Sequence, residues 1–309
     1  MAKLVGIIAM SHSPSWDLSP KLDGPGGRFV AAVQDAKHAL EQARPDALVV
    51  FGPDHFRNFF YDVLPPFCIG VEAVESYGDY ATASGPLPAA QRLGRDILEH
   101  VMEHGFDPAT SLHMSIDHGI TQPYQALDPA LHIPMVPVMV NGSGAPRPSF
   151  RRCFDFGRAV GDAIRASSAA ERVVVVGSGG MSHFLPPVSA DDAGIAPETR
   201  DYIINGRARS REYNAVRERS SAERKKAGTQ GRVSEAWDRW FLDCLETGAL
   251  DGIFAMPPAE MEQQAGNGAH ELRAWMAALG AWNGPVKVAG YEPVPLWVTG
   301  MGCVTGFTA

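Results

Sequence analysis

Short, almost continuous apolar runs are the feature that most constrains the fold of this chain. They are rich in Val, Ile or Met and are bounded by Gly, Pro, Asn or Ser; they lie at Leu4–Met10, Ala47–Phe51, Met135–Val140, Val173–Val176 and near Trp297–Val304. Such runs are typical of strands covered on both faces, as in a mainly parallel sheet. Between them, apolar residues recur at helical spacing in Phe29–Gln42, Ala89–His104 and Phe150–Ala166. This alternation predicts an α/β fold.

The chain has 309 residues and shows neither an internal repeat nor a low-complexity linker. One large α/β domain is an ordinary outcome at this length. We therefore expect a single domain over residues 1–309, an α/β sandwich with a mainly parallel or mixed central sheet. Residues from about 197 to 248 predict a helical excursion. In its basic part, Arg207–Lys226, glutamates interleave with the cations at pairing distances, which favours a solvated helix over a polyanion site.

Composition and charge exclude several classes of function. The net charge of −8 disfavours nucleic acids and anionic membranes as main partners. No apolar run approaches the length of about 18 residues that a membrane span needs. Leu4–Met10 is followed by no small-residue cleavage site, so we interpret it as a core strand and expect a cytoplasmic protein. Four widely spaced cysteines predict free thiols rather than disulfides or a zinc site. We also expect a homo-oligomer.

Four of the ten histidines follow apolar runs or lie beside turns. His12 follows the first run, His55 the second, and His183 follows Val173–Val176 through a glycine-rich turn, while His118 lies in Ile116-Asp117-His118-Gly119. The carboxyl ends of adjacent parallel strands meet at one edge of a sheet, where ligands bind. Imidazoles that converge there indicate a metal site or proton transfer.

Carboxylates could complete such a site. Asp54 precedes His55 and Asp117 precedes His118, and a neighbouring carboxylate can orient an imidazole. Iron(II) prefers two imidazoles, one carboxylate and open positions. Spacing alone does not select the carboxylate among Glu260, Glu262 and Glu271. The pair His270-Glu271 does not belong to the zinc-protease pattern H-E-x-x-H, because position 274 is Ala.

At these residues the sequence resembles the class III extradiol ring-cleavage dioxygenases, over nearly the whole chain and in the same order. The resemblance is carried by Ser11-His12-Ser13-Pro14, Pro53-Asp54-His55, Phe59–Cys68, Asp117-His118-Gly119, Gly177–His183, and His270-Glu271 before Trp275. The loop Leu18–Arg28, Arg57 and the segment Arg207–Gly231 depart from the family's pattern, which bears on the substrate and leaves the reaction class unchanged.

The resemblance implies a role for each matching residue. His12, His55 and Glu271 would bind Fe(II), His183 would be the base that takes a catechol proton, and His118 would be the acid that assists ring cleavage. The substrates would be O2 and a catechol-type aromatic acid resembling 2,3-dihydroxyphenylpropionate, and the family fold is an α/β sandwich. We further hypothesise that Arg57 pairs with the substrate carboxylate.

Two other functions are compatible with the same residues. Two histidines and one glutamate also suit catalytic zinc, so a metal-dependent hydrolase is one alternative. A non-catalytic binding protein on the same scaffold is the other, although such a protein would not need all five proposed positions.

Overall fold

A mixed sheet organises the chain, and the computed structural model describes residues 1–308. Within these residues the sheet has nine strands in the order β4-β3-β6-β2-β7-β1-β9-β8, with β5 paired to β3. The strands β6, β2, β7 and β1 run parallel, and antiparallel neighbours flank them on both sides. The strands are β1 (Lys3–Met10), β2 (Ala47–Gly52), β3 (Phe67–Tyr77), β4 (Ser84–Leu87), β5 (Ala109–Ile116), β6 (Met135–Val140), β7 (Arg172–Ser178), β8 (Lys287–Val294) and β9 (Thr299–Phe307). The predicted α/β fold with a mixed sheet is confirmed.

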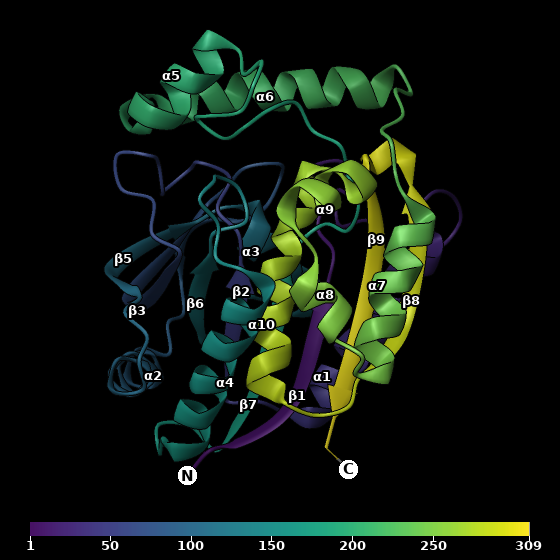
Figure 1. Cartoon of the computed structure of the whole chain (residues 1–309). Coiled ribbons are helices and arrows are strands. Elements are labelled where there is room, and N and C mark those ends of the chain that lie inside the picture. Colours follow the sequence, from purple (N-terminus) through teal and green to yellow (C-terminus); the bar gives the residue numbers. More distant parts are fainter. Residues whose placement is uncertain (309) are drawn as a thin grey trace.

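Helices cover both faces of the sheet (Figure 1). On one face lie α1 (Gly27–Ala43) and α3 (His118–Leu127), and on the other α2 (Gln91–Glu103), α4 (Phe150–Ala166) and α10 (Leu272–Trp282). Successive strand residues alternate between the two cores, as strand geometry requires. Ile7, Val49 and Val175 belong to the core beneath α4 and α10, whereas Ile8, Val50 and Val176 belong to the core beneath α1.

The central helix α10 has no exposed face, because all of its residues are buried. It lies so close to α4 that a Cβ at Gly157 would come within 1.9 Å of the Ala277 carbonyl oxygen. A Cβ at Gly280 would come within 2.0 Å of the Phe154 carbonyl oxygen. Glycine at these positions therefore lets the two helix backbones touch, and α10 holds the residue before it, Glu271, against the sheet.

The segment predicted as a helical excursion is divided in the structure. We call α5 (Pro197–Asn205) and α6 (Ser210–Lys226), with the turn Arg207–Arg209 between them, the arm. The arm lies beyond the carboxyl edge of the parallel strands (Figure 1). The helix α7 (Glu235–Thr247) packs instead on β8, with Trp237 and Phe241 in the main core. The segment is helical as predicted, but only the arm lies outside the main fold, because α7 packs on the sheet.

The remaining short helices connect these parts. They are α8 (Asp251–Ala255), α9 (Pro258–Ala265), and the 3₁₀ turns Asn267–Glu271 and Pro295–Trp297. Among residues 1–308, no helix is both long and apolar enough to cross a membrane. The four cysteines are buried and free, as predicted.

Candidate metal centre and active site

Three of the predicted histidines meet because their strands are neighbours. β2, β7 and β1 are adjacent and parallel, so His55, His183 and His12 leave the same edge of the sheet. Glu271, which ends the turn before α10, lies between them. Its carboxylate oxygens lie 3.2 Å from His55 Nε2, 3.4 Å from His12 Nε2 and 3.5 Å from His183 Nε2. Of the three carboxylates that spacing left open, Glu271 is therefore one that lies among these imidazoles.

His118 joins the same cluster from a different part of the sheet. It begins α3 directly after β5, a strand that lies outside the parallel group and pairs with β3. Its ring stacks on that of His55 with centroids 4.3 Å apart, and it meets the ring of His12 edge-on at 5.4 Å. His12, His55 and His118 each offer a nitrogen, and these atoms lie within 4.8 Å of one another. All four predicted histidines therefore share one cluster.

All four imidazoles use Nδ1 for a hydrogen bond to the protein. The partners are Ser178 Oγ for His12 (2.9 Å), Asp117 Oδ2 for His55 (3.0 Å), Asp79 Oδ2 for His118 (2.7 Å) and the Met181 carbonyl for His183 (2.8 Å). Hydrogen bonds of this kind fix the orientation of metal-binding or catalytic imidazoles. They leave Nε2 of His12, His55 and His183 facing Glu271.

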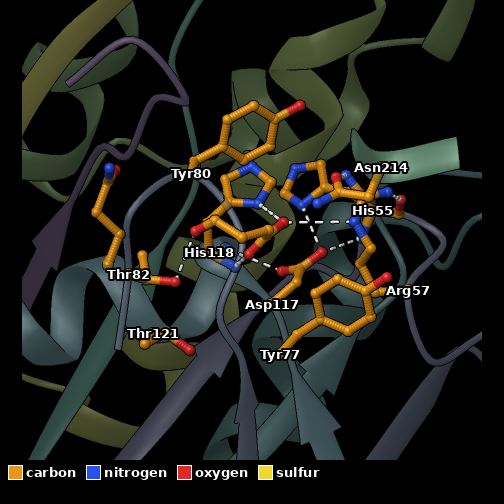
Figure 2. Close-up of polar contacts among 12 residues, drawn as sticks. His55, Arg57, Tyr77, Tyr80, Thr82, Asp117, His118, Thr121 and Asn214 are labelled. Carbon is orange, nitrogen blue, oxygen red and sulfur yellow. Dashed lines mark hydrogen bonds and ion pairs between the residues drawn. The ribbon is translucent and has the colours of Figure 1, made fainter. Parts of the chain in front are cut away.

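The carboxylates pair differently from the prediction (Figure 2). Asp117 caps α3 by accepting from the Gly119 amide, which turns its other oxygen toward His55 rather than toward its neighbour His118. Asp54 contacts no imidazole, since its carboxylate accepts from the backbone amides of residues 57, 58 and 59. The predicted pairs Asp54–His55 and Asp117–His118 are therefore wrong.

Arg57 also has a different setting from the one hypothesised. Its side chain is buried, and Nη1 donates to the His55 carbonyl at 2.8 Å. Nε lies 3.4 Å from Asp79 Oδ2, and Nη2 donates to Asn214 Oδ1 of α6. Nη1 and Nη2 are thus directed to protein groups while Nε makes no hydrogen bond, and pairing of Arg57 with a substrate carboxylate stays a prediction.

The electrostatics of the cluster suit a cation. Burial alone would raise the pKa of Glu271, but His12, His183 and His55 hold it well below its usual range, so the carboxylate is anionic. Burial lowers the pKa of His12 to about 3, so this imidazole is neutral. Burial would also lower the pKa of His55, but Asp117 and Glu271 raise it to about 10, so a metal ion that bound there would displace a proton.

Two glycines that were not predicted as functional create the space for these groups. The Gly180 amide donates to Glu271 Oε2 at 2.8 Å, and a Cβ at neighbouring Gly179 would lie 2.7 Å from the Glu271 carbonyl oxygen. A Cβ at Gly268 would lie 2.0 Å from His183 Nε2. The turn after β7 and the turn before α10 thus meet only because side chains are absent at their contact.

Two imidazoles and a carboxylate, with two further imidazoles beside them, lie at the carboxyl edge of an α/β sheet, an arrangement that suits a transition metal and proton transfer. Comparison with known proteins agrees. The chain belongs to the LigB family, whose model, the catalytic LigB subunit of aromatic ring-opening dioxygenase, matches residues 6–302. The chain is therefore an extradiol ring-opening dioxygenase, and its family implies a metal cofactor. The predicted resemblance is confirmed.

Curated relatives cover almost the full length of the chain. A 2,3-dihydroxyphenylpropionate/2,3-dihydroxicinnamic acid 1,2-dioxygenase of Cupriavidus pinatubonensis is 37% identical over 309 residues, covering 96% of each chain. A protein of the same name from Rhodococcus rhodochrous is 34% identical, covering 97% of this chain and 96% of that one. The crystal structure of an uncharacterized protein from Escherichia coli K12 shares the fold, with a TM-score of 0.51, 17% identity, and coverage of 97% of this chain and 99% of that one.

Proposed function

We propose that this protein uses iron(II) to cleave the ring of a catechol-type aromatic acid of the 2,3-dihydroxyphenylpropionate kind with O2. One observation carries the proposal: His12, His55 and Glu271 converge through their donor atoms, with His118 and His183 against the same cluster. The substrate class comes from the relatives, which are named for a dihydroxyphenyl acid and match over nearly the full chain.

His12, His55 and Glu271 would hold the iron. Two neutral imidazoles and one carboxylate are the donor set of non-haem iron oxygenases, and they leave positions open for other ligands. Iron(II) bound there supplies a redox-active Lewis acid that brings the catechol oxygens and O2 together. The protein's own contribution is to fix the donors, since a hydrogen bond at Nδ1 orients each imidazole.

His183 would take the catechol proton. Its Nδ1 donates to the Met181 carbonyl, so this nitrogen carries the hydrogen and Nε2 of the neutral ring is the proton acceptor. Nε2 faces Glu271 and so lies beside the proposed metal position. An imidazole is well matched to proton transfer near pH 7.

His118 would supply a proton during ring opening. Its Nδ1 donates to Asp79, a carboxylate whose pKa burial would raise but His118 lowers, so Asp79 is anionic. An anionic partner stabilises an imidazole while it carries a proton. The carbonyl partner of His183 and the carboxylate partner of His118 thus support opposite roles for the two residues.

The test is an anaerobic, iron(II)-loaded preparation given catechol, 2,3-dihydroxyphenylpropionate and isomeric dihydroxyphenyl acids. We expect O2 uptake and a yellow ring-opened product, with the highest kcat/KM for the propionate-bearing catechol. A zinc-loaded preparation is the control, because a zinc hydrolase would be active there. Absence of O2 uptake with every catechol would overturn the proposal.

Variants separate the proposed roles. His118→Gln and His183→Gln should retain iron and lose turnover, because neither residue is a proposed ligand. His12→Ala should lose iron. Iron lost from His118→Gln as completely as from His12→Ala would contradict the division into ligands and proton-transfer residues.

A further inference from the structure

We infer that the arm is part of the catalytic apparatus: Asn214 on α6 positions His118 through Arg57 and Asp79. The inference rests on the proposed function of His118 and deepens it. Figure 2 shows His118, Arg57 and Asn214 converging near Asp117. The sequence indicates none of these connections, since Asp79, Arg57 and Asn214 lie in separate segments without a shared motif.

Asp79 is the immediate partner of His118. It is fully buried, and its two oxygens accept from the His118 backbone amide at 2.8 Å and from His118 Nδ1 at 2.7 Å. One residue therefore fixes both the start of α3 and the rotation of the imidazole. A buried carboxylate requires such partners, because an unpaired buried charge is costly.

Arg57 links Asp79 to the arm. Its Nε forms an ion pair with Asp79 Oδ2 at 3.4 Å without a hydrogen bond, and its Nη2 donates to Asn214, which is 5% exposed. Since a guanidinium is planar, a partner on Nη2 also fixes the direction of Nε. Asn214 therefore acts on the Asp79 carboxylate without touching it.

The arm also contacts the residue after Asp79, Tyr80, at a second place. Glu218, one helical turn after Asn214, accepts from the Tyr80 amide and from Asn214 Nδ2, both at 2.8 Å. Tyr80 and Ala81 have positive φ values of 50° and 61°, a conformation that persists only where surrounding contacts hold it. The Tyr80 ring meets the ring of His118 edge-on, with centroids 4.7 Å apart.

These contacts give the arm a role beyond covering the site. Arg211, on the same helix, donates to the Tyr77 carbonyl and packs on the Tyr77 ring. Arg211 and Glu218 thus contact Tyr77 and Tyr80, on either side of Asp79 in the chain. Asn214 contacts Arg57, which pairs with Asp79. Asp79, Arg57 and Asn214 are therefore positioning residues for His118, whereas Asp117 holds the proposed ligand His55.

The test compares Asp79→Asn and Asn214→Ala with Glu223→Ala, a control at an exposed position of the same helix. Loss of a partner that orients a catalytic imidazole typically costs 10–100-fold in activity. We expect kcat to fall about 100-fold in Asp79→Asn and about tenfold in Asn214→Ala, with KM and iron content within about twofold of the parent. Glu223→Ala should match the parent.

A second readout needs neither iron nor turnover. In metal-free protein labelled with ¹⁵N-histidine, the slowly exchanging Nδ1 proton of His118 is assigned by its absence in His118→Gln. This resonance should disappear in Asp79→Asn, exchange faster in Asn214→Ala and persist in Glu223→Ala. If Asn214→Ala does not fold, Glu218→Ala replaces it, since Glu218 holds both Asn214 and the Tyr80 amide.

The two measurements distinguish failure of this inference from failure of the proposed function. A parent protein without ring cleavage would remove the proposed function, while the imidazole resonance would still test the connection from the arm. The inference is overturned if Asn214→Ala leaves both the resonance and kcat unchanged, or if its turnover falls only in proportion to lost iron.

Discussion

Asp117→Asn should weaken metal binding more than it weakens turnover. Asp117 Oδ2 accepts two hydrogen bonds from His55, at 2.7 Å from the backbone amide and 3.0 Å from Nδ1, and Oδ1 accepts from the Gly119 amide at 2.8 Å. Asparagine keeps the shape of the side chain and replaces one acceptor by a donor. In either orientation of the amide, at least one buried N–H then faces another N–H.

The size of the loss in metal affinity follows from the contacts that Asp117→Asn removes. If the amide keeps its oxygen on Gly119, the cap of α3 survives and His55 loses its orientation. Loss of a partner that orients a ligand costs about 10–100-fold in metal affinity, or roughly 1.4–2.7 kcal/mol. A buried N–H left without an acceptor costs about 1–3 kcal/mol of folding stability. The folding penalty is below the roughly 5–15 kcal/mol by which folded proteins are typically stable, so we expect the variant to fold.

The assay is an anaerobic titration with iron(II) against a competing chelator, followed by turnover at saturating iron. We expect the affinity to fall within the stated range, and kcat at saturation to fall by less. The matched comparison is Asp79→Asn, in which turnover should fall while iron binding is retained. If Asp117→Asn bound iron normally and lost only turnover, the proposal that Asp117 orients the metal ligand His55 would be refuted.

Three further predictions follow from individual contacts. Gly268→Ala places a Cβ 2.0 Å from His183 Nε2 and should displace that ring, so kcat should fall about 100-fold while iron content stays unchanged in metal analysis. Burial raises the pKa of Asp238 from 3.8 to about 6, so this group stabilises the fold fully below about pH 3.8 and loses that contribution as the pH rises through 6. Between these pH values Asp238 should account for a change of about 3 kcal/mol in the free energy of unfolding, measured with denaturant. This pH dependence should vanish in Asp238→Asn, and its persistence would contradict the raised pKa of Asp238. Removal of the metal by a chelator should lower the midpoint of thermal unfolding. Iron added back at a thousandfold excess over its Kd should raise the free energy of unfolding by about 4 kcal/mol. His12→Ala should show no such increase.

The core of the fold could be predicted from sequence because it obeys simple periodicities. Fully buried parallel strands give continuous apolar runs, and β1, β2, β6 and β7 were predicted on that basis. The elements that were missed have reasons as well. α10 is buried all round and so has no apolar stripe, and α3 contains Pro123, which weakens a helical pattern. The polar strands β4 and β5 carry mixed burial patterns that resemble loops.

The residues of the candidate site also differ in whether the sequence predicts them. Strand-end convergence placed His12, His55 and His183 correctly, because it depends only on which strands are parallel neighbours. His118 was grouped with them because it lies beside a turn, and it reaches the cluster from a strand outside that group. Asp79 carried no signal in the sequence, because a lone aspartate after Gly78 is indistinguishable from an ordinary turn residue.

The mistaken carboxylate pairs show why adjacency in sequence is a poor guide to such contacts. A residue that immediately precedes a helix turns its side chain back to the first free amides, so Asp117 points toward Gly119 and away from the ring of His118. Asp54 is used in the same way by the turn that follows it. The carboxylates that do hold imidazoles come from other loops: Asp117 serves His55, and Asp79 serves His118. His55 and His118 are therefore oriented only when a second loop has docked, so their geometry and tertiary folding are completed by the same contacts.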